Sequence, residues 1–264
     1  IVYVASPHSE HKRQALLAIA AGKHVLVEKP LALDAAEARE IRDAARAAGV
    51  FAMEAMWTRF LPRTLVLEQL LRDGVLGELQ LVTADFGFRF DFDPESRLFN
   101  PALGGGALLD LGVYPIWFAH FALGTPRRVL ATGRPAQTGV DGQCALVLTG
   151  DTGAQALLHT TLFATTPGEA SLSGTLARLR VESSFHAPGG FTLESPATNQ
   201  RLHWSDTSGL RESAGLAWQA TAAARHIAEG RTESPLHPLE RSIAVLETID
   251  AARAQLGLAM AGTW

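Results

Sequence analysis

The sequence lacks several features that would place it in a particular class of protein. Its 264 residues contain one cysteine, Cys144, so no internal disulfide can form. This cysteine content is compatible with a reducing compartment. No continuous apolar run approaches the ~18 residues that suggest a membrane span. The net charge of −4 gives no reason to expect nucleic acid or an anionic membrane as a partner. We therefore expect a soluble protein of the cytoplasm.

The composition is typical of a globular protein, with 47% apolar and 19% charged residues. Residues 1–60 alternate short apolar runs with helical segments, and Gly22 and Gly49 stand where a helix C-cap needs left-handed backbone. The predicted elements are strands at 1–4, 25–27 and 50–53 and helices at 9–21 and 34–48. This alternation predicts a parallel α/β sheet with right-handed crossovers.

The pattern changes after residue 60, where strands follow one another with few helices between them. The predicted strands are 79–90, 128–133, 143–148, 154–163, 169–173 and 176–183. The predicted helices are 62–72, 106–123, 212–229 and 238–256. Asp141-Gly142 and the stretch 150–153 resemble hairpin turns. We predict two domains, 1–60 and 61–264, with an α/β fold followed by an antiparallel α+β fold.

Lys29 lies directly after a predicted buried strand, in the tripeptide Glu28-Lys29-Pro30. Pro30 has no backbone N–H and disfavours helical backbone at Lys29, so the strand ends here. Ligands of open α/β sheets bind beyond the carboxyl ends of the strands. A lysine at this place can donate a proton or hold a negative charge. On these three residues alone, a plain surface lysine is the favoured alternative.

A loop with two histidines follows the first predicted strand. Ser6, Pro7, His8 and His11 stand at the same edge of the sheet as Lys29. The two histidines are three residues apart at a helix start, so they can face one way. No third metal ligand accompanies them, and we predict no metal site. Contact with a cofactor and a solvated helix start are the remaining alternatives.

Two further segments carry groups suited to binding or proton transfer. Trp57 and Arg59 follow the third strand and can stack on and bind an aromatic, anionic ligand; a domain-linking role is the alternative. Asp110 and Tyr114 lie four residues apart on one helix face, after the triglycine 104–106. A phenol and a carboxylate aimed at a cleft can act as an acid/base pair. The alternative is that the two side chains are only polar groups on a helix surface, which is the usual case for such a pair.

Together these segments resemble the glucose–fructose oxidoreductase / inositol dehydrogenase / MocA family. The matching segments are 5–11, 21–30, 54–62 and 104–115. The stretch 54–62 is most similar to the dimeric trans-dihydrodiol dehydrogenase branch, which includes NADP-dependent xylose dehydrogenases. The resemblance covers nearly the whole chain. It implies a Rossmann domain over 1–60 and a substrate-binding, dimerising domain with an open, mainly antiparallel sheet over 61–264.

The resemblance also implies roles for single residues. Lys29 would hold the substrate hydroxyl and help lower the pKa of Tyr114, and Tyr114 would take the hydroxyl proton as hydride leaves the carbon. Asp110 would orient the substrate. The expected contacts of the cofactor, NADP or NAD, are Ser6, Pro7, His8, His11, Glu28, Lys29, Trp57 and Arg59.

The chain departs from this family in one respect, because it has no Gly-x-Gly-x-x-Gly phosphate loop. The family places that loop before the position of Ile1, which already reads as part of a strand. We therefore expect an incomplete Rossmann sheet and a chain that is a fragment of a longer enzyme. We expect a fragment of this kind to be inactive on its own.

Three functions remain open at this stage. The first is an NAD(P)-dependent oxidoreductase acting on a secondary hydroxyl of a sugar, polyol or dihydrodiol. The second is a non-catalytic binding protein on the same scaffold, against which the presence of both Lys29 and Tyr114 argues. The third is a lyase or isomerase with a tightly held nicotinamide. The alternating strands over 79–183 predict a homodimer formed through one sheet face.

Overall fold

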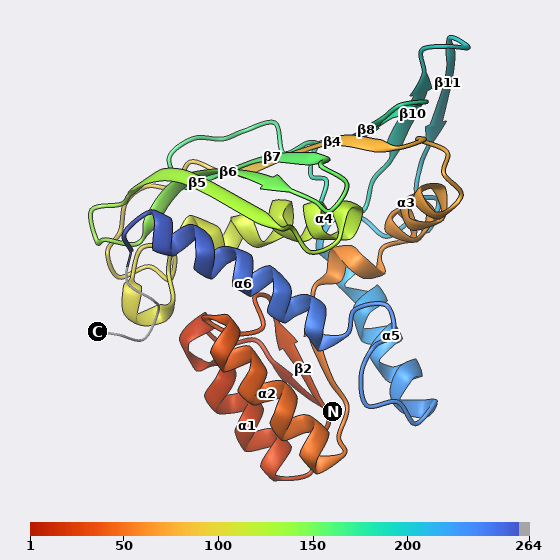
Figure 1. Ribbon diagram of the computed structural model, residues 1–264. Coiled ribbons are helices and arrows are strands. Elements are labelled where there is room, and N and C mark those ends of the chain that lie inside the picture. Colours follow the sequence, from red (N-terminus) through yellow and green to blue (C-terminus); the bar gives the residue numbers. More distant parts are fainter. Residues whose placement is uncertain (259–264) are drawn as a thin grey trace.

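The structure begins with a small parallel sheet. The computed structural model describes residues 1–258, and its first three strands are parallel in the order β1-β2-β3. Their bounds are Val2–Val4, Val25–Glu28 and Ala52–Ala55. The connecting helices α1 (His11–Ala20) and α2 (Ala35–Ala48) lie together beside the sheet (Figure 1). The parallel α/β unit predicted for the start of the chain is confirmed.

Helix α2 begins and ends where the sequence signals place it. The Asp34 side chain accepts a hydrogen bond from the Glu37 backbone N–H at 2.8 Å, which satisfies one free donor of the first turn. Gly49 follows the helix with φ of 64°, the left-handed conformation that glycine adopts without steric cost. Local chemistry therefore fixes both ends of this helix.

The second part of the chain forms an eight-stranded sheet in the order β11-β10-β9-β8-β4-β7-β6-β5. Only β4 and β7 pair in parallel, and the other neighbours are antiparallel. The strands are β4 Leu79–Gly87, β5 Arg128–Pro135, β6 Asp141–Thr149, β7 Gln155–Thr161, β8 Ala170–Gly174, β9 Arg178–Val181, β10 Phe191–Ser195 and β11 Gln200–Trp204. The mainly antiparallel sheet is confirmed, but the sequence reading missed β10 and β11.

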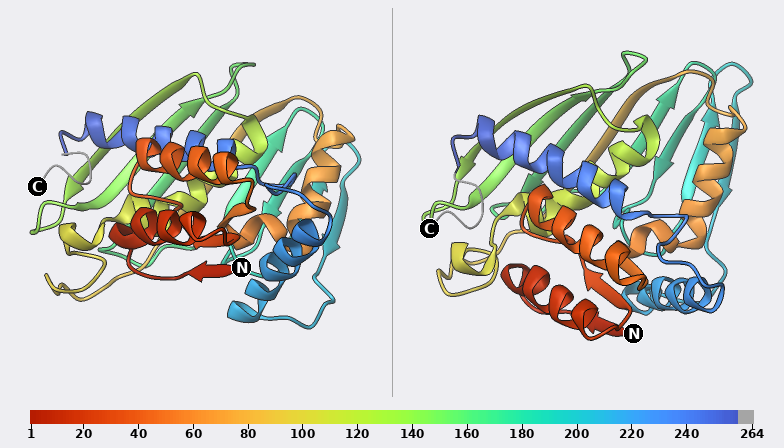
Figure 2. Two further views of the ribbon diagram at one scale, coloured as in Figure 1. Left: turned by 90° about the horizontal axis from the view of Figure 1, so that it is seen from below. Right: turned by 60° about the horizontal axis from the view of Figure 1, so that its bottom comes forward.

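Helices cover one face of the large sheet. Helix α4 (Val113–Leu123) packs on β4 and β7, and α6 (Leu239–Gln255) packs on β5. Helix α6 also contacts α2, so it lies between the large sheet and the parallel unit (Figure 2). Helix α3 (Pro62–Arg72) matches its predicted bounds. The C-terminal helices thus join the two parts of the chain, and the proposed boundary at residue 60 stays a prediction.

The parallel sheet is covered on its second face by the C-terminal part of the chain. Helix α5 (Ala217–Ala228) contributes Ala222 and Ala223 to a separate apolar cluster. In that cluster the two alanines meet Leu26, Phe51 and Met53 of the parallel unit. The first unit therefore completes its core only with residues from the far end of the sequence.

One segment of the described chain, Pro101–Leu123, is helical and apolar enough to cross a membrane by length and composition. Most of this segment is buried inside the structure. It contains the π-helical turn Leu108–Gly112 and helix α4. Burial against the sheet accounts for its apolar character, as in the core helix of a globular domain.

The triglycine 104–106, just before the π-helical turn, is required by packing within the protein. A side chain at Gly104 would clash with Leu33, and one at Gly106, where φ is 122°, would clash with the Asp141 carboxylate. Asp141 in turn accepts a hydrogen bond from the Leu108 backbone N–H, so it caps the helical segment. The prediction of a hairpin turn at Asp141-Gly142 is wrong, because both residues belong to β6.

Candidate active site

The turn after β2 is held from two sides by buried polar groups. The carbonyl of Pro30 accepts a hydrogen bond from His11 Nδ1 at 2.8 Å. The N–H of Leu31 donates to Glu54 Oε1 at 2.9 Å, and Glu54 Oε2 lies 2.9 Å from His237 Nε2. Glu54 and His237 are almost fully buried. These contacts fix the direction in which Lys29 leaves the strand.

Lys29 reaches across to the first turns of the 108–123 helical segment. Its Nζ donates to the Asp110 carbonyl at 2.7 Å and to Asp110 Oδ1 at 3.1 Å. Arg97, which the sequence reading did not select, donates from Nη1 to the same Oδ1 at 2.8 Å. Burial alone would raise the pKa of Asp110, but Lys29 and Arg97 hold it well below its ordinary value. Asp110 is therefore a carboxylate shared by two cations.

Tyr114 lies beside the same lysine. The Nζ of Lys29 is 5.1 Å from the centroid of the Tyr114 ring, and Trp57 Nε1 donates to the phenol oxygen at 3.0 Å. Burial raises the pKa of Tyr114, and the opposing effects of Lys29 and Trp57 reduce that rise without reversing it. The expected help from Lys29 is present, but burial outweighs it. Trp57 acts on the phenol itself.

The loop after β1 forms one wall of a cavity of about 320 Å³, which we call the histidine cavity. It is lined by Ala5, Ser6, Pro7, His8, His11, Glu28, Lys29, Arg97, Leu103 and Asp110. The cavity thus brings together seven of the ten predicted site residues, namely Ser6, Pro7, His8, His11, Glu28, Lys29 and Asp110. The Oγ of Ser6 is buried here, and no described residue forms a hydrogen bond with it.

The two histidines of this loop are held by backbone carbonyls. His8 Nδ1 donates to Gly104 O at 2.9 Å, and its Nε2 is 3.9 Å from Asp110 Oδ1. Burial lowers the pKa of His8 to about 4, with a further lowering by Lys29, so the ring is neutral at pH 7. His11 also contacts Ser6 O, at 3.0 Å from Nε2. His11 thereby ties the loop after β1 to the turn that carries Lys29.

Arg59 does not line this cavity, contrary to the sequence-based placement beside the cofactor. Its guanidinium is 1% exposed and donates to the Leu236 carbonyl at 2.9 Å and to Glu68 Oε2 at 2.8 Å. It lies over the Phe121 ring. Arg59 thus fills the interior between α3, α4 and the start of α6. This position agrees with the alternative interpretation, in which the segment links the two domains.

A second, larger cavity of about 710 Å³ adjoins the first, and we call it the aromatic cavity. Its lining includes Glu28, Trp57, Phe88, Tyr114, Ser184, His186, Ala187, Pro188, Arg211 and Leu216. Glu28 lines both cavities, so they meet beside the end of β2. The residues of the 184–188 loop were missed by sequence reasoning, because no local motif connects them to Tyr114.

The histidine cavity fits the nicotinamide half of a dinucleotide. It lies beyond the carboxyl ends of β1 and β2, where open α/β sheets bind such ligands. The unpartnered Ser6 Oγ supplies a polar atom that a carboxamide can satisfy. Within residues 1–258, no group of three or more histidine, cysteine, aspartate or glutamate side chains is arranged to hold a metal ion.

Comparison with known proteins identifies the class to which this fold and site belong. Residues 1–56 match an oxidoreductase family with an NAD-binding Rossmann fold, and residues 64–180 match the GFO/IDH/MocA C-terminal domain. The trans-1,2-dihydrobenzene-1,2-diol dehydrogenase of Mus musculus is 33% identical over 98% of this chain and 78% of its own length. The human protein of the same name is 30% identical over the same shares.

Solved structures give the same result. The aldose-aldose oxidoreductase of Caulobacter crescentus, complexed with glycerol, superposes with a TM-score of 0.85 at 25% identity, over 96% of this chain and 76% of that one. A 3-ketoreductase from Actinomadura kijaniata with NADP and TDP-benzene gives 0.80 at 27% identity, over 97% and 78%. The fold and site are those of a nicotinamide-dependent oxidoreductase. The chain belongs to the GFO/IDH/MocA family.

Proposed function

We propose that the protein oxidises a secondary hydroxyl of a cyclic diol or sugar by transferring hydride to NAD or NADP. One observation carries the proposal: the buried ammonium of Lys29 bonds Asp110 and lies over the ring of Tyr114. This places a cation beside the phenol that must lose a proton. The diol and aldose oxidoreductases similar to this chain support the choice of substrate class.

Tyr114 is the group that removes the hydroxyl proton. A phenolate forms there only if its negative charge is stabilised, because burial opposes it. The indole N–H of Trp57 and the ammonium of Lys29 both supply that stabilisation. Asp110 holds the ammonium in place through its carboxylate and its backbone carbonyl. Trp57 and Lys29 thus stabilise the phenolate directly, and Asp110 does so by holding Lys29.

Ser6, Pro7, His8 and Glu28 would hold the nicotinamide ring, which accepts the hydride when the cofactor is bound. His8 is neutral at pH 7 and adds no charge to that side of the cavity. The substrate would then occupy the aromatic cavity, on the side of Tyr114. Glu28 lines both cavities, which supports this placement of cofactor and substrate. The two ligands must touch for hydride transfer, and the cavities meet at Glu28.

The test is reduction of NAD and NADP, followed by absorbance, with trans-1,2-dihydrobenzene-1,2-diol and with aldoses. We expect turnover with at least one pair in the complete enzyme that contains this chain. Tyr114→Phe should lower kcat by about 10²–10⁴-fold, the usual effect of losing a general base. Absence of turnover with every pair, in an enzyme that binds cofactor, would refute the proposal.

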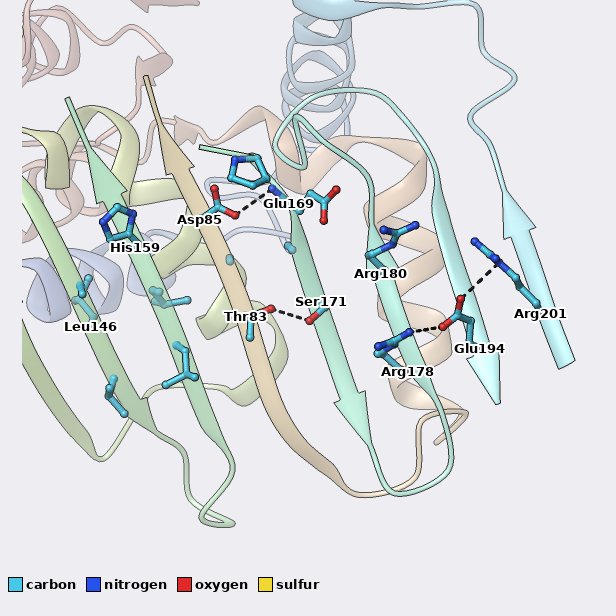
Figure 3. A pocket seen from close by; sticks show the side chains of 17 residues that line it. Thr83, Asp85, Leu146, His159, Glu169, Ser171, Arg178, Arg180, Glu194 and Arg201 are labelled. Carbon is cyan, nitrogen blue, oxygen red and sulfur yellow. Dashed lines mark hydrogen bonds and ion pairs between the residues drawn. The ribbon is translucent and has the colours of Figure 1, made fainter. Parts of the chain in front are cut away.

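We also propose a homodimer formed through the open face of the large sheet. In-register Leu130, Val147 and Leu157 form a row on that face, with Leu130 46% and Leu157 45% exposed. Beyond β4 and β8 the same face carries charges of both signs, where Glu194 pairs with Arg178 at 2.5 Å and with Arg201 at 3.5 Å (Figure 3). A face with apolar rows and both signs of charge can match its own copy across a two-fold axis.

Sedimentation at micromolar concentration tests the dimer. Leu157→Glu places a charge in the row and should convert the dimer to a monomer. Leu176→Glu, an exposed leucine in the β8–β9 turn, is the matched control and should leave the dimer intact. A wild-type monomer at this concentration would contradict the proposal.

A further inference from the structure

The loop between β9 and β10 is fixed in place by two buried side chains. Thr58 Oγ1 donates to the His186 carbonyl at 2.7 Å, and Arg63 donates from Nη2 to the Phe185 carbonyl. Thr58 and Arg63 are each 1% exposed. Both come from the segment that follows β3, next to Trp57. The loop backbone therefore has a set position relative to the proposed base.

The ring of His186 packs directly against the groups around that base. Its centroid lies 4.2 Å from that of Phe86, 4.9 Å from that of Tyr114 and 5.8 Å from that of Trp57. The ring is part of the aromatic cavity wall. Its Nδ1 is buried and has no hydrogen-bond partner among residues 1–258. A buried polar atom without a partner is unfavourable, and the cavity is the place from which a partner can come.

The surroundings of His186 determine what it can bind. Burial lowers its pKa to about 3, with further lowering by Lys29 and Arg63, so the ring is neutral at pH 7. A neutral imidazole has one N–H donor and one acceptor nitrogen, which matches a hydroxyl group. The wall that contains His186 also has apolar Phe88, Ala187 and Pro188, and its other polar side chains include Ser184, Arg211, Glu212 and Ser213.

We infer that His186 is a specificity-determining residue, which binds the hydroxyl next to the one that is oxidised. The inference rests on the proposed function. We infer the adjacent hydroxyl, and not a more distant one, because the imidazole packs on the Tyr114 ring with 4.9 Å between the ring centroids. The substrate class is then a vicinal diol, in a ring or a sugar, in preference to a simple secondary alcohol. Sites that hydrogen-bond a substrate hydroxyl discriminate strongly against analogues that lack it.

The experiment compares trans-cyclohexane-1,2-diol with cyclohexanol in the complete enzyme. His186→Phe retains an aromatic ring for packing but removes both nitrogens. We expect kcat/KM for the diol to fall by about 10–100-fold, mainly through KM, and the value for cyclohexanol to change less than about threefold. His186→Asn, which keeps a donor and an acceptor, should recover part of the loss. Thermal melts verify that both variants fold.

The control is His203→Phe, the same substitution on β11, where the ring is exposed and does not line the cavity. It should leave kcat/KM unchanged for both substrates. The inference would be overturned if His186→Phe lowered kcat/KM equally for the diol and for cyclohexanol, or lowered it for neither. The proposed function would still stand in that case, because the wild-type enzyme would be active. A wild-type enzyme inactive on both substrates, and on the dihydrodiol and aldoses, would overturn the two together.

Discussion

Lys29 and Asp110 lie 81 residues apart in sequence, yet the ammonium of one bonds both the carbonyl and the carboxylate of the other. The two residues come from different parts of the fold: Lys29 directly follows β2 of the parallel unit, and Asp110 lies in the π-helical turn under the large sheet. Their contact therefore joins the two parts of the protein at the proposed reaction centre.

Lys29→Met should lower kcat by about 10²–10⁴-fold and leave cofactor affinity within a few-fold, because it removes the charge that stabilises the phenolate but no phosphate contact. Steady-state kinetics and cofactor titration on the complete enzyme measure the two effects. Lys23→Met, on the exposed turn after α1, is the matched control and should behave as wild type. An undiminished kcat would remove Lys29 from the mechanism.

Trp57→Phe should shift the pH dependence of oxidation. Trp57 donates to the phenol oxygen and so lowers the pKa of Tyr114; removing that donor raises the pKa further. The alkaline rise of kcat should move up by about one pH unit, the size of one hydrogen bond to a charged oxygen. A pH–rate profile measures it. A shift toward lower pH would show that the indole opposes ionisation.

Asp110→Asn should destabilise the fold, because it leaves the charges of Lys29 and Arg97 without their shared partner. Breaking a buried pair of this kind costs about 3–5 kcal/mol, here reduced because the Arg97 side chain is 56% exposed. The folded-state pKa of Asp110 is depressed, so its contribution is complete at pH 7 and is lost only as pH falls below the unfolded value of about 3.9.

Urea denaturation of wild type and Asp110→Asn at several pH values measures this effect. The difference in unfolding free energy should be constant from neutral pH down to about 5 and should narrow below about 4. A difference that grows on acidification would mean that Asp110 is protonated in the folded protein.

Gly106→Ala should be strongly destabilising, because its methyl group would clash with the Asp141 carboxylate, which caps the helical segment. Gly49→Ala is the matched control: its backbone is left-handed with φ of 64°, and no described residue has an atom within 4 Å of the added methyl. The control should cost about 1 kcal/mol from backbone conformation alone, and Gly106→Ala at least twice that. Thermal unfolding compares them. Equal losses would refute the packing explanation.

Elements with local end signals could be predicted from the sequence, and elements that depend on distant partners could not. Helix α2 has its cap at Asp34 and its stop at Gly49, both next to the helix itself. Strand β11 has a largely exposed, polar sequence and exists because it pairs with β10. No local pattern distinguishes such a strand from a loop.

The same distinction applies to the candidate site. Lys29 and Tyr114 stand in recognisable motifs, and the structure brings them together. Arg97 and His186 lie in irregular segments, so only the folded chain places them beside Asp110 and Tyr114. Arg59 follows Trp57 closely in sequence but turns to Glu68, because the backbone forms a tight helical turn there.

The cover that α5 provides for the parallel sheet has a consequence for synthesis on the ribosome. Leu26, Phe51 and Met53 emerge well before Ala222 and Ala223, which shield them. The nascent parallel unit therefore presents an apolar surface until α5 has been made, the kind of surface that chaperones recognise and that promotes aggregation. Synthesis of α5 is thus the step that removes this surface from water.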